Sequence, residues 1–492
     1  MKAIGLMLLA LALSTPSFAD EKPNVLFISI DDLNDWIGCL GGHPQALTPN
    51  IDEIASRGIL FTNAHCGAPA CNPSRAAVFS GLMPQHTGVW GNKSGSISKL
   101  QPDAPLLPES FREAGYHTWG TGKMLHSAKS GPFEEYFSTE QRWSPLPGDK
   151  VKYNKKDQAT KGTDNPSHVV KHNGETYVLP LNRMPSDRRP DTNDGESHDW
   201  GPWDVPDSEF GDTQITDWAI SKLEEKSEKP FFLGVGYYRP HIPLWAPARF
   251  FERFRDEPGK LPPVLEGDLD DLSDAGRKWA LEPVTAGSHE TIVRFDQWQA
   301  AVEAYLACVT YVDYEIGRLL EVLDESAHAD NTVVVLWTDH GWHLGEKQHW
   351  GKWTGWERST RVPLMIAPAK NQADIVAQAG ARCDQPVGLI DLYPTLTDLC
   401  GVAAPDILDG ESLVPLLKNP EKRTGRHLFT LFDKGNVSVR DVRWRYIQYA
   451  DQSDELYDLK KDPNEWENLA HSPEHTAILK QFKASVGDYF AE

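Results

Sequence analysis

The chain has 492 residues, of which 40% are hydrophobic and 24% charged, and its formal net charge is −22 at pH 7. This length suffices for one large α/β domain with a smaller satellite, or for two or three independent domains. The negative charge argues against nucleic-acid binding. An anionic substrate would be repelled at long range, so that only a local basic pocket would attract it.

The first 19 residues have the features of a secretory signal peptide. A basic residue, Lys2, precedes the apolar run from Leu6 to Leu13, and small residues lead to Ala19. The apolar run is too short to span a bilayer, and the residue after Ala19 is not a cysteine that could carry a lipid. We therefore expect residues 20–492 to form an exported protein without a membrane anchor, periplasmic or secreted.

Two short apolar runs predict buried parallel strands that end in acidic residues. Residues 24–30 lead into Asp31 and Asp32, and residues 332–338 lead into Asp339. In open α/β sheets the functional groups lie beyond the carboxyl ends of the strands. Carboxylates at that edge suit a hard divalent cation, although the same acids could simply cap the next helix.

Basic residues follow other segments in a similar way. A third buried run, residues 231–237, precedes His241, and prolines on both sides of this histidine fix the backbone. Lys123 and His126 end a glycine-rich segment, and Lys352 lies shortly after the second acidic motif. Taken alone, each of these is more often a surface or locally hydrogen-bonded residue. Their combination with the acids predicts a site.

The alternation of strands and helices predicts a doubly wound α/β domain over residues 20–425. The strongest helical patterns are residues 50–58, 107–115 and the long amphipathic run 301–323. Residues 129–206 are polar and rich in Pro, Gly, Asp and Asn, which predicts an insertion of irregular loops near the active site. From residue 426 to 492, short antiparallel strands and a closing helix over 473–489 predict a small α+β C-terminal subdomain.

The sequence Cys71-Asn72-Pro73-Ser74-Arg75 and the apolar run behind it predict a helix that begins at the cysteine. Pro and Ser are ordinary residues of a first helical turn, so the turn alone is not specific. It nevertheless resembles the C-x-P-S-R maturation motif of the type I sulfatases.

Three further segments resemble the same family, in the same order. Residues 339–346 resemble its D-H-G-x-x-L-G-E signature, residues 115–126 its G-Y-x-T-x-x-x-G-K-x-x-H segment, and Lys352 its second sulfate-binding lysine. His340 and the Arg-Pro-His-Ile-Pro loop at residues 239–243 resemble the iduronate-2-sulfatase-like branch within the alkaline phosphatase superfamily. The resemblance covers almost the whole mature chain. It implies a large mixed sheet sandwiched by helices, with a small C-terminal subdomain.

The resemblance also implies the chemistry of a sulfuric ester hydrolase. Cys71 would be oxidised by a formylglycine-generating enzyme to formylglycine (3-oxoalanine), whose hydrate is the nucleophile. One Ca²⁺ would be held by Asp31, Asp32, Cys71, Asp339 and His340, although imidazole is a poor ligand for calcium. The remaining catalytic roles would be carried by Arg75 on the oxidised residue, Lys123 and Lys352 on the sulfate, His241 as the acid at the leaving group, and His126 as the acceptor of the last proton.

The implied substrate is a sulfated carbohydrate, such as a 2-O-sulfated uronate or a marine polysaccharide unit. We expect Arg239, Trp350 and Trp353 to contact it, because Trp350 and Trp353 flank Lys352 and aromatic faces stack on sugar rings. Most of the 17 tryptophans will be packing residues. Two alternatives remain: a phosphonate or phosphodiester hydrolase of the same superfamily, and a non-catalytic protein that binds sulfated glycans.

The six cysteines give no disulfide framework. With Cys71 assigned to catalysis, five remain, and an odd number leaves at least one free thiol. Cys383 and Cys400 are the pair that we expect to be bonded if any pair is. Cys308 lies in a helical pattern and is expected to be buried.

Overall fold

The computed structural model describes residues 22–97, 105–126, 131–139, 168–172, 175–185, 187, 198–283, 287–372, 375 and 378–491. The predicted signal peptide, residues 1–19, therefore lies outside the described residues. Among the helices that are described, none is both long and apolar enough to cross a membrane.

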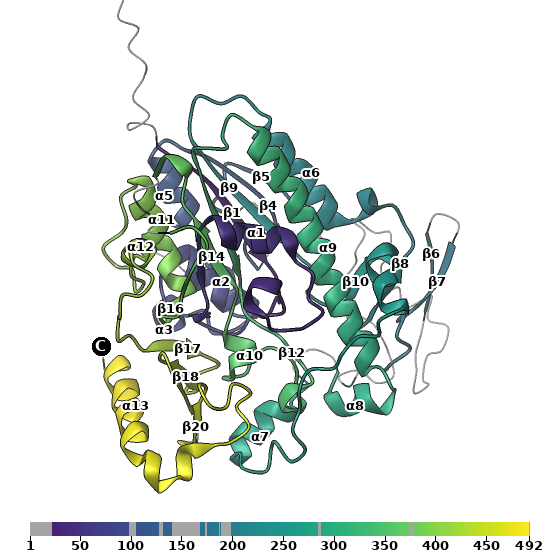
Figure 1. The fold of residues 1–492 in the computed structure, drawn as a ribbon, viewed down its shortest axis with the longest axis vertical. Helices are drawn as coiled ribbons and strands as arrows, with labels where there is room; N and C mark the ends of the chain where they lie inside the picture. The colour runs from purple at the N-terminus through teal and green to yellow at the C-terminus, as the bar shows by residue number, and fades with distance from the viewer. Residues whose placement is uncertain are drawn as a thin grey trace, which may run out of the picture.

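A mixed sheet of eight strands forms the centre of the molecule (Figure 1). Its spatial order is β15 (Ala381–Cys383), β2 (Ile59–Phe61), β14 (Leu364–Ala367), β11 (Thr332–Thr338), β1 (Asn24–Ile30), β9 (Phe231–Tyr237), β4 (His117–Gly122) and β5 (Glu135–Phe137). Of these strands only β14 runs against the others. The three predicted buried strands are confirmed as β1, β9 and β11, with every residue buried.

Helices cover both faces of this sheet because its central strands are apolar on both sides. Leu26, Ile28 and Ile30 of β1 pack into one core, whereas Val25 and Phe27 pack into the other. The first face is covered by α1 (Pro49–Arg57), α6 (Gly211–Leu223) and α9 (Trp298–Glu325), and the second by α2 (Cys71–Ser80), α5 (Leu107–Glu113) and α11 (Leu392–Cys400).

The C-terminal part forms a separate antiparallel sheet with a helix against it, drawn in yellow-green to yellow in Figure 1. Its strands, in spatial order, are β17 (Leu428–Leu431), β18 (Val437–Arg440), β19 (Trp444–Gln448) and β20 (Asp454–Asp458). Phe482 and Val486 of α13 (Thr476–Tyr489) pack on Val439 and Tyr446. The predicted fold class, a large mixed sheet between helices with a small α+β C-terminal part, is confirmed.

The polar stretch 129–206 is more regular than predicted. β5 extends the main sheet, β8 (Trp200–Trp203) pairs in parallel with β10 (Leu244–Pro247), and β6 (His168–His172) forms a hairpin with β7 (Glu175–Leu179). The prediction of irregular loops is therefore wrong for these segments. The sequence gives no strong strand signal there because β5 and β8 are only three and four residues long.

The remaining elements are short. They are α3 (Pro84–Thr87), α7 (Asp274–Leu281), α8 (His289–Arg294), α10 (Glu357–Thr360), α12 (Val414–Lys418), β3 (Ala64–His65), β12 (His343–Leu344), β13 (Trp350–Gly351) and β16 (Val387–Gly388).

The expected bond between Cys383 and Cys400 is not formed, and all six cysteines are free thiols. Cys383 lies on the edge strand β15, and Cys400 ends α11. Burial raises the pKa of the Cys400 thiol, which also hydrogen-bonds the Tyr116 side chain.

Candidate active site

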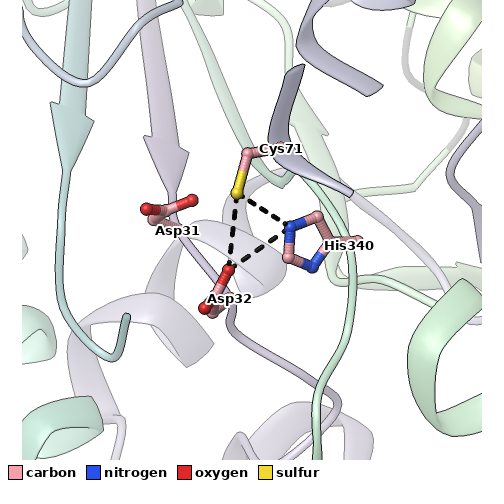
Figure 2. A group of neighbouring side chains, drawn as sticks. All are labelled: Asp31, Asp32, Cys71 and His340. Atoms are coloured by element: carbon pink, nitrogen blue, oxygen red, sulfur yellow. Dashed lines mark hydrogen bonds and ion pairs between the residues drawn. The ribbon is translucent and has the colours of Figure 1, made fainter. Parts of the chain in front are cut away.

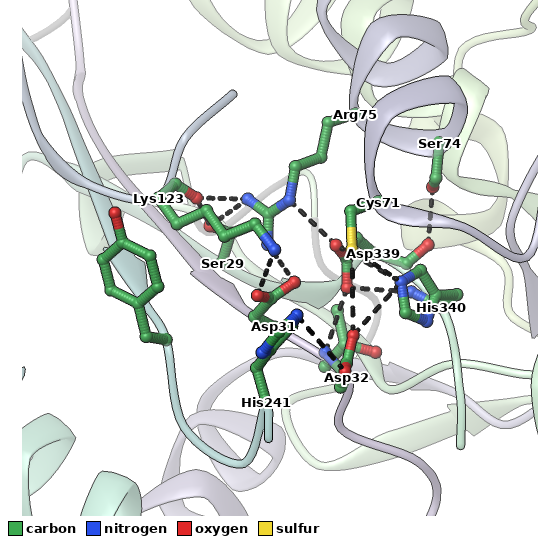
Figure 3. Close-up of polar contacts among 12 residues, drawn as sticks. Ser29, Asp31, Asp32, Cys71, Ser74, Arg75, Lys123, His241, Asp339 and His340 are labelled. Carbon is green, nitrogen blue, oxygen red and sulfur yellow. Dashed lines mark hydrogen bonds and ion pairs between the residues drawn. The ribbon is translucent and has the colours of Figure 1, made fainter. Parts of the chain in front are cut away.

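The acidic residues of the predicted site meet at one edge of the main sheet. Asp31 and Asp32 follow β1, and Asp339 and His340 follow its parallel neighbour β11. All four side chains are fully buried (Figure 3). The backbone of Asp32 is left-handed, with φ 61°, and its N–H donates to Asp339 Oδ1 over 3.2 Å. The two strand ends are therefore linked directly.

Cys71 reaches the same place from the other direction, as the first residue of α2. Lys352 Nζ donates to Cys71 Sγ over 3.0 Å, and His340 Nε2 lies 3.3 Å from the same sulfur. The thiol points toward Asp32 Oδ1 at 3.9 Å (Figure 2). The positive end of the helix dipole adds to these cations. Negative charge at the position of Sγ is therefore stabilised from several sides.

Arg75 and Lys123 connect the acids to one another. Arg75 Nε donates to Asp339 Oδ2 over 2.8 Å, and its Nη2 lies 3.4 Å from Asp31 Oδ1. Arg75 Nη1 donates to the carbonyl of Lys123, whose ammonium group pairs with Asp31 Oδ2. Both basic side chains are buried. The contacts of Arg75 and Lys123 thus link the ends of β1, β4 and β11 to one another.

Lys352 supplies a second ammonium group from outside the main sheet. It follows β13, and its Nζ donates to Asp32 Oδ1 over 2.7 Å. Three carboxylates thus face three permanent cations, Arg75, Lys123 and Lys352. The formal charges of these six side chains balance.

The pKa values reflect this crowding. Burial would raise the pKa of the Cys71 thiol, but Lys123, Lys352 and His340 bring it well below its ordinary value. Burial lowers and Asp339 raises the pKa of His340, which rises overall to about 9. Burial raises the pKa of Asp339 although Arg75 opposes it. The cations therefore make Cys71 an anion-stabilising position.

The two central carboxylates differ from each other. Burial raises the pKa of Asp32, and Lys352 offsets this only in part. Burial acts on Asp31 too, but Lys123, His241 and Arg75 together outweigh it and hold the pKa of Asp31 below its ordinary range. Asp31 is thus ionised. Of these two carboxylates, Asp32 is the one whose negative charge the neighbouring cations compensate less.

His241 faces the same carboxylates from the loop after β9. Its Nδ1–H donates to the carbonyl of Ile242 over 2.6 Å, which leaves Nε2 toward Asp32 Oδ2 at 3.9 Å. Burial lowers its pKa, while Asp32 raises it. His126 lies next to Cys71, since its hydrogen bond helps to lower the pKa of that thiol.

The sequence predicts that Arg239 contacts the substrate. In the structure it instead supports the loop that carries His241. Its Nη1 donates to the carbonyl of His241 over 3.0 Å and its Nε to that of Trp245 over 3.2 Å. Asp212 accepts from the backbone N–H groups of Tyr238 and Arg239. The guanidinium group is thus used to fix the shape of the loop that carries His241.

The tryptophans near Lys352 also require a correction. Trp350 is 2% exposed, stacks on Trp200 and donates from Nε1 to His289 Nδ1 over 2.9 Å. It is therefore a packing residue and does not present a face to a sugar. Trp342 and Trp356 are equally buried, whereas Trp353 is half-buried.

The cluster has a donor set that fits a divalent cation. One ligand atom from each of Asp31, Asp32, Cys71 and His340 lies within 4.8 Å of the others. Asp32 Oδ2 is buried and has no hydrogen-bond partner among the described residues. Carboxylate oxygens suit a hard cation. Asp339 lies beside this group, with Oδ2 3.6 Å from His340 Nε2.

Several supporting residues were not predicted from the sequence. Ser74 Oγ donates to the carbonyl of Asp339 over 2.5 Å, and Tyr305 Oη donates to that of Asp32 over 2.8 Å. Ser74 belongs to the C-x-P-S-R motif and could have been proposed on that basis. Tyr305 and Asp212 carry no local signal, because they are ordinary helical residues distant from the motifs.

The structure brings ten of the predicted residues together. They are Asp31, Asp32, Cys71, Arg75, Lys123, His126, His241, Asp339, His340 and Lys352.

Comparisons with known proteins agree with this geometry. The sequence profile of the sulfatase family matches residues 23–402, and the profile of the N-sulphoglucosamine sulphohydrolase C-terminal region matches residues 345–491. A sulfatase from Formosa agariphila is 35% identical over 94% of this chain and 86% of its own length. Iduronate 2-sulfatase from Mus musculus is 30% identical over 79% of this chain and 70% of its own length.

The fold is also found among solved structures. A phosphonate monoester hydrolase from Silicibacter pomeroyi has a TM-score of 0.74 at 22% identity and covers 95% of each chain. At that identity the likeness concerns the fold alone, whereas the family match spans most of the chain. The chain therefore belongs to the sulfatase family and is a sulfuric ester hydrolase.

Proposed function

We propose that this chain is an exported sulfatase that hydrolyses sulfate esters of a sugar or polysaccharide fragment, with formylglycine made from Cys71. The observation that carries the proposal is the convergence of Lys352 Nζ and His340 Nε2 on Cys71 Sγ at the start of α2. An oxygen nucleophile needs such a cationic position, and so does the anionic ester that it attacks. The signal-like residues 1–19 support export to the periplasm or the medium.

The charges explain how an acidic protein binds an anionic ester. The three carboxylates and three permanent cations of the cluster cancel. A divalent cation, which we propose to be Ca²⁺, would be held by Asp31, Asp32 and His340 with Asp339 beside them, and would polarise the sulfate and acidify the nucleophile. With this cation the centre carries an excess of positive charge and attracts a sulfate monoester locally.

The basic side chains divide the remaining work. Lys123 and Lys352 hold sulfate oxygens where negative charge develops. His241, in its imidazolium form, donates the Nε2 proton to the departing sugar oxygen, while Nδ1–H keeps its hydrogen bond to the carbonyl of Ile242. His126, next to position 71, accepts the proton that the nucleophile loses when sulfate is released. Arg75 keeps Asp339 in place.

The substrate class follows from the relatives and remains part of the proposal. The relative from Mus musculus is named for its action on iduronate 2-sulfate. We therefore propose a sulfated sugar, with a 2-O-sulfated uronate and a marine polysaccharide unit as the first candidates.

The test uses protein co-expressed with a formylglycine-generating enzyme. We expect sulfate release from 4-nitrophenyl sulfate to exceed turnover of the matched phenyl phosphonate and phosphodiester esters. Mass spectrometry of the peptide that contains Cys71 should show the aldehyde in the active protein. Full turnover by protein whose Cys71 is entirely thiol would refute the nucleophile. Faster turnover of the phosphorus esters would refute the substrate class.

A further inference from the structure

A pocket of about 830 Å³ opens beside the reaction centre. This volume lies within the range of pockets that bind small molecules. Its walls come from the segment after α3, from α7 and its C-terminal end, and from the loops after β13 and β17. Its lining includes the aromatic and charged residues Trp90, Lys93, Lys278, Trp279, Glu282, Trp353 and Asp433.

The pocket is joined to the reaction centre by hydrogen bonds. The backbone N–H of Asn72, next to Cys71, donates to Asn92 Oδ1 over 3.0 Å, and Asn72 Nδ2 donates to the carbonyl of Gly91 over 3.1 Å. Trp353 directly follows Lys352, and its N–H donates to the carbonyl of Pro69 over 3.0 Å. The walls are therefore held at fixed positions relative to the nucleophile.

Three tryptophans of the pocket are half-buried, in contrast to Trp350 and its neighbours. Trp353 has a left-handed backbone, with φ 76°, which is costly for a bulky residue. A Cβ atom at Gly91 would lie 3.3 Å from the Trp353 ring, so the absence of a side chain there leaves room for this ring. Partly exposed indole faces next to polar groups suit the C–H faces of a sugar ring.

The polar groups of the pocket are of both signs. Lys93 and Lys278 are exposed and form no ion pair with any residue that the structure describes. Glu282 and Asp433 are also exposed. Carboxylates accept hydrogen bonds from hydroxyl groups, and the two ammonium groups match a carboxylate or sulfate substituent.

We propose that this pocket binds the sugar ring adjacent to the sulfated one, and that this second ring carries an anionic group facing Lys93 and Lys278. The inference rests on the proposed function and makes the substrate an anionic oligosaccharide of at least two rings. Trp279 and Trp353 provide the apolar contacts with the ring, and the lysines select its charge.

The test compares a large and a small substrate. The probes are sulfated tetrasaccharides from heparin, chondroitin sulfate and carrageenan, with 4-nitrophenyl sulfate as the substrate that lacks a second ring. We expect Trp279→Ala to lower the ratio of kcat/KM for the best tetrasaccharide to that for the aryl sulfate about tenfold, mainly through KM. The double variant Lys93→Ala/Lys278→Ala should lower the same ratio and has little effect on folding, because both side chains are exposed.

The controls are Trp218→Ala, a half-buried tryptophan on α6, and Lys480→Ala, an exposed lysine on α13. Neither should change the ratio. An unchanged ratio in both pocket variants, or an equal loss on both substrates, would overturn the proposal.

A binding measurement separates this inference from the proposed function. Cys71→Ala protein is titrated calorimetrically with the same tetrasaccharides, with and without Trp279→Ala. Binding that weakens about tenfold with Trp279→Ala supports the pocket even if the parent protein releases no sulfate. If sulfate is released but binding is indifferent to Trp279, Lys93 and Lys278, the pocket inference alone is wrong.

Discussion

Two charge clusters of this protein pair carboxylates with lysine and arginine side chains, and they differ in what the charges surround. At the edge of the main sheet, three carboxylates face Arg75, Lys123 and Lys352. Where the C-terminal sheet meets the large domain, three other carboxylates face three other cations. That second cluster, the interdomain cluster, consists of Asp268, Glu357, Glu465, Lys347, Arg440 and Arg445.

In the interdomain cluster each charge links one segment to another. Arg445 on β19 pairs with Glu357 on α10, and its Nε lies 2.9 Å from Glu465 Oε1. Lys347 Nζ donates to Asp268 Oδ1 over 2.6 Å. At the sheet edge, by contrast, the charges converge on Cys71 Sγ. Balanced buried charge is therefore not in itself a sign of catalysis, whereas convergence on one reactive atom is.

The largest effect is expected from removing that atom. Cys71→Ala should reduce sulfate release by roughly a thousandfold or more, because the nucleophile is lost. The midpoint of thermal unfolding should change little. Cys39→Ala, a half-buried thiol outside the site, is the control and should retain activity. Substantial activity in Cys71→Ala would show that the convergence of charges on Cys71 Sγ does not distinguish a catalytic cluster from a structural one.

Metal removal should act on the sheet edge and not on the interdomain cluster. We expect chelation to abolish activity and added calcium to restore it, because Asp31, Asp32 and the oxidised residue 71 that we propose would offer oxygen ligands. Calcium should also raise the unfolding midpoint of the parent protein but not that of Asp31→Asn. Restoration by zinc alone would contradict the oxygen-ligand assignment.

His241→Ala should be selective for the leaving group. General acid catalysis contributes about 10²–10⁴-fold, so turnover of sugar sulfates should fall by that factor. Nitrophenolate leaves without protonation, and its release should fall far less. Lys352→Ala should impair both substrates, since it acts on the sulfate. Equal losses for His241→Ala on both substrates would shift the acid role to His126 or His340.

Changes in the interdomain cluster should affect stability and leave the activity of the folded fraction unchanged. Arg445→Ala leaves the buried carboxylate of Glu465 without its ion-pair partner and removes one of the cations beside Glu357, so it should cost about 3–5 kcal/mol of unfolding free energy. Arg443→Ala is the matched control on the same edge of the molecule. Its ion pair with Asp458 is 45% exposed on the arginine side, so its loss should destabilise the fold much less than the loss of Arg445. Denaturant unfolding of both variants measures the difference.

The sequence predicts the strands and the clustering of the charged side chains around Cys71 well because both depend on local patterns. β1, β9 and β11 are uninterrupted apolar runs, and the residues that follow them lie at one sheet edge by the geometry of parallel strands. The helix that begins at Cys71 follows from the same kind of pattern.

The errors concern burial and contacts between distant segments. Trp350 and Trp353 flank the same lysine, yet Trp350 packs on Trp200 and only Trp353 reaches the pocket. Arg239 looks like a substrate ligand until its bonds to the His241 loop are seen. β5 is three residues long and is stabilised by pairing with β4. None of these outcomes depends on a pattern in neighbouring residues.

The origin of the pocket walls has a consequence for how enzymes of this type diverge. Lys352 and Trp353 are consecutive, so that the loop that we propose binds the sulfate also forms one wall of the proposed sugar pocket. The other walls, Trp90 and Trp279, lie on segments outside the main sheet. Substitutions at these surface segments can exchange one sugar preference for another without disturbing the sheet that carries the chemistry. Substrate range and catalytic power are therefore open to separate selection, in evolution and in engineering.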